Sequence, residues 1–180
     1  MYSVGDLIVY GNTGVCEVQK ITARVCPGTD EERMYYVLVP RFRKGTIYAP
    51  VNNTSVFMRP VMSAKEVNGL IDQIPSVKVE THHFQSNQQR MEYYRELLHS
   101  HNSMDLIELI MSAYDKRLRL QESSRTIGEI DASCMKQAEE MLNGEFSVAL
   151  GIPYEEVPDY IGDRVEKVTR KRSRWRLQRA

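Results

Sequence analysis

The chain has 180 residues, with 24 Lys plus Arg and 24 Asp plus Glu, so its formal net charge at pH 7 is zero. This length allows one large or two small domains with a sizeable core, and a zero net charge taken alone argues against a nucleic-acid-binding protein. The charges are unevenly distributed, however. Residues 1–78 carry 9 basic and 7 acidic side chains (+2), residues 79–162 carry 7 and 15 (−8), and residues 163–180 carry 8 and 2 (+6). The zero is a cancellation, and only the last segment is strongly basic.

The first sixty residues alternate between short segments rich in β-branched and aromatic residues and turns rich in Gly, Pro and Asn. This pattern predicts short strands joined by tight connections. The predicted strands are 7–10, 15–21, 34–39, 46–48 and 55–58. Five short strands in so few residues favour a small, strongly bent barrel of the SH3-like or Tudor-like kind. Such a sheet often has an edge that a partner's strand can extend.

A helical pattern begins after Pro60. Ser63 and Glu66 have the spacing of a capping box, which predicts a short helix to about residue 74. The polar, aperiodic stretch that follows predicts an interdomain linker. We therefore expect an N-terminal domain over residues 1–75, including this helix, and a linker over residues 76–86.

Residues 87–162 carry apolar side chains at helical spacing and predict a compact all-α domain. The first helix is expected over residues 87–99, and Asn102 is a candidate N-cap for the second. Thr126 with Glu129 predicts a capping box for a third helix, which Gly151 would end with a left-handed cap. A short helix over residues 153–161 follows, and residues 163–180 are expected to form a flexible basic tail. The predicted fold class is α+β with two domains.

Several classes of function lack support in the sequence. No apolar run approaches the ~20 residues of a membrane helix and the start lacks a signal-peptide pattern, so a cytoplasmic protein without membrane contact is expected. Neither the three cysteines nor the His pairs have a persuasive metal-site spacing, and no motif of nucleophilic or phosphate-binding chemistry occurs. Cys16 lies in an apolar strand, so its thiol pKa should be raised, which does not suit a nucleophile. We expect no enzyme, no cofactor, no metal and no small-molecule substrate.

Two stretches of the chain resemble the CarD/CdnL family of bacterial RNA polymerase-binding transcription regulators. The first comprises VGDLIVYGNTGVCEVQKI (4–21), YYVLVP (35–40) and GTIYAPV (45–51). The second comprises RMEYYRELLHS, DLIELI and AEEMLNGEFSVALGIPYEEV in the helical region. Both occur in the family's order over roughly residues 1–161. The transcription-repair coupling factor carries a related barrel.

The resemblance implies that the barrel docks on the β subunit of RNA polymerase by edge-strand pairing. The helical domain would contact promoter DNA at the upstream edge of the melted bubble and stabilise the open complex by binding it more tightly than the closed one. Tyr48 stands where some relatives have an arginine, and nearby Arg43 or Lys44 could replace that charge. The implied polymerase contacts are Arg24, Arg43, Lys44, Thr46, Ile47 and Tyr48.

On the DNA side the family uses a tryptophan at the start of the helical domain as a wedge against the opened base step. The single tryptophan here is Trp175, and the residues that align with the wedge are Phe84 or Asn87. Arg90 matches a family arginine. A basic group at a helix end could bind phosphates, or could instead complement the helix dipole in solvent. That group is Lys116, Arg117 and Arg119.

The basic tail surrounds one aromatic residue, which is typical of phosphate pairing combined with base stacking. Its candidate DNA-binding residues are Arg170, Arg172, Arg174 and Trp175. A solvated end, or an end folded back on the acidic helical domain, remains an alternative. The expected partners are RNA polymerase β and promoter DNA, with DNA affinity weak without the polymerase. Two rival functions stay open: an interaction module that uses the barrel alone, its helices serving a partner or a dimer, and a small RNA- or ribosome-associated protein.

Overall fold

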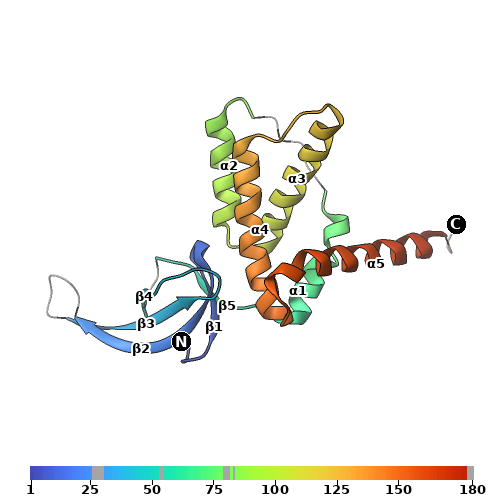
Figure 1. The fold of residues 1–180 in the computed structure, drawn as a ribbon. Coiled ribbons are helices and arrows are strands. Elements are labelled where there is room, and N and C mark those ends of the chain that lie inside the picture. Colours follow the sequence, from blue (N-terminus) through green and yellow to red (C-terminus); the bar gives the residue numbers. More distant parts are fainter. Residues whose placement is uncertain (26–30, 53–54, 79–81, 83, 178–180) are drawn as a thin grey trace. The chain divides into compact units, whose positions relative to one another are not determined.

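The computed structural model describes residues 1–25, 31–52, 55–78, 82 and 84–177, with the backbone alone for residues 172–177. The chain divides into two compact units, Met1–Met62 and Ser63–Ala180. The first is a five-strand antiparallel sheet and the second is helical, as Figure 1 shows. The predicted α+β architecture is confirmed.

The sheet of the first unit has the strand order β4-β3-β2-β1-β5, and all its neighbouring strands are antiparallel. Its elements are β1 (Leu7–Tyr10), the 3-10 turn η1 (Gly11–Thr13), β2 (Gly14–Val25), β3 (Glu32–Pro40), β4 (Ile47–Pro50) and β5 (Met58–Pro60). The last strand begins where the sequence predicted that it would end. β4 and β5 are the edge strands, and β2 and β3 form a long hairpin with a register shift between Val18 and Lys20.

The core of the sheet comes from residues that alternate along the strands, as expected for a sheet with one buried face. Its fully buried members are Ile8, Cys16, Val18, Tyr36, Leu38 and Ala49. The buried Tyr36 also bonds to the start of the chain, because its hydroxyl oxygen accepts a hydrogen bond from the backbone N–H of Tyr2 at 2.9 Å. The N-terminal segment is thereby fixed to the sheet.

Cys16 gives this unit a testable pH dependence. Burial raises the pKa of its thiol from 9.0 to about 11, as the sequence predicted in direction. Between pH 9 and pH 11 the unfolded chain loses the thiol proton while the folded state retains it. The free energy of unfolding therefore falls as pH rises from 9 to 11. In the wild-type protein this fall amounts to up to about 3 kcal/mol, and we expect it to be absent in Cys16→Val. Urea unfolding of both proteins at several pH values measures it, and parallel pH profiles would contradict it.

The second unit contains five α-helices and two 3-10 turns in its described part. They are α1 (Ala64–Ile71), η2 (Ile74–Ser76), α2 (Asn87–His99), α3 (Ser103–Glu122), α4 (Glu129–Leu150), η3 (Tyr154–Glu156) and α5 (Val157–Leu177). Buried apolar side chains from α2, α3 and α4 form most of its core, including Leu98, Leu109 and Phe146.

Helix caps explain most of the helix boundaries. The Ser63 capping box is confirmed, with the backbone N–H of Ser63 donating to the Glu66 carboxylate at 2.8 Å. The Asn102 cap is confirmed, and Gly151 ends α4 in the left-handed region at φ 67. The Thr126 capping box is wrong, because α4 begins after Gly128 without a side-chain cap.

The boundary between the units lies earlier than predicted. The sequence placed the helix after Ser63 with the N-terminal domain, but α1 packs against α4 and α5 and belongs to the helical unit. Val67 and Ile71 on α1 are fully buried. A short helix with one apolar face needs a partner surface, and helices supply it here.

The C-terminal segment also differs from its prediction. In place of a short helix over residues 153–161 and a flexible tail, α5 runs from Val157 to Leu177. The Lys and Arg residues of this segment are good helix formers, and Arg170 pairs with Glu166 one turn earlier. Gly162 interrupts the pattern without ending the helix.

Candidate functional site

The free edge of the N-terminal sheet at β4 is the first candidate site. The backbone N–H of Val51, directly after β4, donates to the carbonyl of Met34 at 2.8 Å. Backbone groups of successive strand residues point alternately to the two sides, so Ala49 and Ile47 also face β3. The N–H and carbonyl of Tyr48 therefore point to the free edge. Pro50 has no N–H, which leaves Tyr48 as the edge donor within Ile47–Pro50.

Two of the predicted polymerase contacts meet at this edge. The guanidinium carbon of Arg24 lies 3.7 Å from the centroid of the Tyr48 ring, within the range of a cation–π interaction. Both side chains are exposed. Arg24 thereby places a positive charge over the Tyr48 ring. We call Arg24, Tyr48 and the outer backbone of β4 the β4 edge.

The other predicted contacts lie on the approach to β4. Arg43, Lys44 and Thr46 are exposed, whereas Ile47 is half-buried against the sheet core. The structure adds two apolar side chains that the sequence analysis did not select, Met34 (46% exposed) and Phe42 (45% exposed). Phe42 stands between arginines in a turn, and an aromatic residue in such a polar turn is the signal that could have identified it.

The second candidate site centres on Asp131, which is fully buried in the first turn of α4. The Tyr94 hydroxyl donates to its Oδ1 at 2.6 Å, and the Lys116 ammonium donates to its Oδ2 at 2.5 Å. Arg90 completes an ion pair, with Nη1 3.6 Å from Oδ2. Burial raises the pKa of Tyr94, and the hydrogen bond to Asp131 acts in the same direction. We call Tyr94, Arg90, Lys116 and Asp131 the Asp131 network.

Phe84 lies beside this network rather than alone in solvent. Its ring is half-buried and contacts the rings of His82, Tyr93 and Tyr94 at centroid distances of 6.0, 5.4 and 6.1 Å. The guanidinium of Arg90 lies 5.6 Å from the Phe84 centroid. The structure thus brings together two predicted DNA contacts, Phe84 and Arg90, while Asn87 is exposed at the start of α2.

The three cations that the sequence grouped at the end of α3 have different environments. Lys116 is bound to Asp131, Arg117 lies over the Tyr114 ring at 4.9 Å, and Arg119 pairs with Asp115 on the exposed helix surface. Lys116 therefore shares its ion-pair partner, Asp131, with Arg90 and not with Arg117 or Arg119. Among the residues that the structure describes, none forms a hydrogen bond with the buried Nε of Arg90.

The remaining candidates lie on α5. Arg170 is exposed and pairs with Glu166, whereas the side chains of Arg172, Arg174 and Trp175 lie outside the described part of the chain. Across that same part, no group of three or more His, Cys, Asp or Glu side chains could hold a metal ion. Among the described helices, none is both long and apolar enough to span a bilayer.

Comparison with known families identifies the sheet unit. Residues 2–62 match the model of the CarD-like/TRCF RID domain, which spans the N-terminal unit and leaves the helical unit unmatched. No curated protein matches the chain. The N-terminal unit thus matches the CarD-like/TRCF RID domain, which confirms the resemblance of the first stretch. The resemblance of the helical stretch stays a prediction. Domains of this class bind the β subunit of RNA polymerase, and CarD-like proteins are generally non-catalytic regulators.

Proposed function

We propose that the protein is a cytoplasmic, non-enzymatic transcription regulator that docks on the RNA polymerase β subunit and contacts promoter DNA. The observation that carries this proposal is the RID-domain match over residues 2–62, in a sheet that has β4 as an edge strand with no described strand paired on its outer side. Docking would occur through the N-terminal unit. The helical unit would contact DNA near the upstream edge of the bubble and stabilise the open complex.

The β4 edge suits strand addition by a partner. Main-chain hydrogen bonds from an added strand supply affinity, and exposed side chains along the edge supply specificity. Tyr48 offers its backbone N–H and carbonyl, and Arg24 adds a positive charge over the Tyr48 ring. Arg43, Lys44 and Thr46, exposed just before β4, extend the polar part of this surface.

The Asp131 network suits DNA contact because it carries one more positive than negative charge. Arg90 and Lys116 are 24% and 37% exposed at their side chains, so phosphate oxygens can reach both while Asp131 stays buried between them. Residues 79–162 sum to −8, which opposes broad affinity for duplex DNA. Docking on the polymerase would overcome this by raising the effective concentration of the helical unit at the promoter. Phe84, next to Arg90, supplies the apolar surface for an opened base step.

Phe84→Ala is expected to shorten the lifetime of the open complex about tenfold, which corresponds to a loss of ~1.4 kcal/mol. The reason is that a wedge stabilises the unstacked base step and not the closed duplex. Phe84→Met is the matched control, because methionine is also used as an apolar wedge and should preserve most of the lifetime. Dissociation kinetics of heparin-challenged promoter complexes measure it. An unchanged lifetime for Phe84→Ala, with polymerase binding intact, would show that Phe84 is not the wedge.

The negative charge of the helical unit favours one alternative, an interaction module in which the helices bind a second protein rather than DNA. A photoreactive group placed at position 87, in place of Asn87, distinguishes the two functions by what it crosslinks to in the promoter complex. Crosslinks to the upstream bubble edge support DNA contact. Crosslinks to protein alone support the module.

A further inference from the structure

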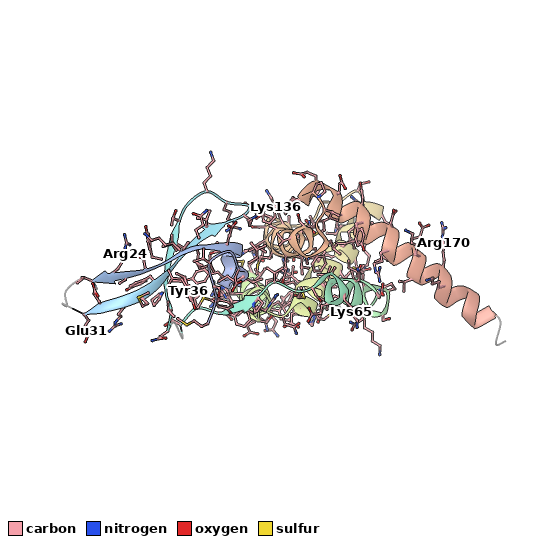
Figure 2. The ribbon with its side chains drawn as sticks, turned by 90° about the horizontal axis from the view of Figure 1, so that it is seen from below. Arg24, Glu31, Tyr36, Lys65, Lys136 and Arg170 are labelled. Atoms are coloured by element: carbon pink, nitrogen blue, oxygen red, sulfur yellow. The ribbon has the colours of Figure 1, made fainter. Side chains whose placement is uncertain are left out.

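The second half of α5 is a strongly basic helical surface that the Asp131 network does not use. Residues 163–180 carry 8 basic and 2 acidic side chains (+6), and α5 continues through them to Leu177. Lys167, Arg170 and Lys171 are exposed. With position 174 they follow the i, i+3, i+4, i+7 spacing of one helix face. Figure 2 shows Arg170 on the part of α5 that extends past the other helices of its unit.

The first half of α5 is held firmly in the helical unit. Arg164 donates two hydrogen bonds to the carboxylate of Asp72, at 2.7 Å from Nε and 2.8 Å from Nη2. One turn earlier, the Tyr160 hydroxyl donates to the side-chain oxygen of Asn68 at 2.7 Å, and Val157 is fully buried. A bidentate pair fixes direction as well as distance. Because the helix is continuous, this anchor sets the direction in which the basic half extends.

The described contacts of the basic half do not neutralise it. Arg170 pairs with Glu166 within the same helix, and their side chains are 76% and 61% exposed. Such a solvent-exposed pair contributes little, so a phosphate can displace the carboxylate at small cost. Folding back onto the acidic helices is incompatible with a straight continuation of an anchored helix.

We propose that α5 is a DNA-binding arm that pairs with the phosphate backbone of duplex DNA, and that the Asp72–Arg164 pair positions it. This goes beyond the proposed function, because it assigns DNA affinity to the protein without polymerase. Charge complementarity favours an anionic polymer as the occupant. A membrane surface fits less well, because an interfacial helix needs a free apolar face, and Ile161, Val165 and Val168 are half-buried in the fold.

The test measures how the affinity of the full-length chain for a duplex of random sequence depends on salt. Lys167→Gln with Lys171→Gln should reduce the slope of log K against log salt by about 1.8, because each lost phosphate contact accounts for ~0.9. The matched control is Lys65→Gln with Lys136→Gln, which removes the same charge from exposed positions on α1 and α4, labelled in Figure 2. The control should leave the slope unchanged. Equal slopes in all three proteins, or equal reductions in both variants, would overturn the proposal.

The positioning role has its own test. Asp72→Asn should weaken duplex binding severalfold, and exchanging the charges with Asp72→Arg and Arg164→Asp should restore it at unchanged net charge. Thermal unfolding followed by circular dichroism verifies that the variants are folded. No loss in Asp72→Asn, or no recovery in the exchange, would overturn the positioning role.

Single-stranded RNA and vesicles of anionic lipid serve as competing ligands in the same assay. If the substitutions at Lys167 and Lys171 reduced the salt slope for RNA or vesicles but not for duplex DNA, duplex DNA would not be the ligand of α5. Polymerase β binding should be unaffected by all these variants. A failure of the arm is therefore distinguishable from a failure of the docking proposal.

Discussion

Replacing Tyr48 with proline is expected to weaken binding to the RNA polymerase β subunit by tenfold to a hundredfold. Proline removes the outward N–H of Tyr48, the edge donor of β4, and leaves the partner's acceptor unsatisfied at a cost of about 1–3 kcal/mol. The sheet itself should tolerate the change, because that N–H does not face β3 and proline is accepted on edge strands. Binding of the full-length chain to purified core polymerase measures it.

Tyr48→Ala is the control that separates backbone from side chain. Alanine keeps the N–H but removes the ring under Arg24, whose exposed cation–π contact is worth about 0.5–1 kcal/mol. We therefore expect only a loss of a few-fold. If Tyr48→Pro bound as tightly as Tyr48→Ala while remaining folded, docking by strand addition at β4 would be excluded.

Asp131→Ala is expected to have the largest effect on stability, with a loss of about 3–5 kcal/mol in the free energy of unfolding. The substitution removes the acceptor of the Tyr94 hydroxyl and the counter-charge of Lys116 and Arg90 from a fully buried position. Asp131→Asn retains one acceptor oxygen and should cost less. Denaturant unfolding of the full-length chain measures both.

Asp115→Ala is the matched control for this prediction. It likewise removes an aspartate carboxylate, but from α3, where Asp115 pairs with Arg119 on the exposed surface. Exposed pairs of this spacing contribute about 0.3–0.5 kcal/mol. Comparable losses in Asp131→Ala and Asp115→Ala would mean that the network does not stabilise the helical unit.

The Asp131 network was not predicted from the sequence. The first four strands and the caps at Ser63, Asn102 and Gly151 follow from local patterns, and they were predictable because a cap or an alternation involves neighbours in the chain. Asp131 had no such signal, because an acidic residue in a first helical turn is ordinarily explained by the helix dipole. Its role depends on Tyr94 and Lys116, which belong to other helices. The Thr126 capping box was wrong because α4 begins after Gly128, which has no side chain to form a cap.

In the candidate sites, too, local sequence patterns were predictable and contacts between residues distant in the chain were not. The family resemblance selected Arg24 and Tyr48, but only the fold shows that they contact each other across β3. The helix α1 was assigned to the wrong unit because its capping box specifies a helix and not its packing partner. The extension of α5 was missed because a run of basic residues is compatible with a solvated tail, and the anchoring contact of Arg164 with Asp72 joins positions that are distant in the chain.

The proposed function depends most directly on docking to the polymerase. The decisive measurement is binding of the full-length protein to the isolated β subunit, with Tyr48→Pro and Tyr48→Ala measured in parallel. We predict saturable binding to β, reduced only a few-fold in Tyr48→Ala and at least tenfold in Tyr48→Pro. Absence of binding by the folded wild-type protein, or binding to core polymerase through other subunits alone, would contradict the account.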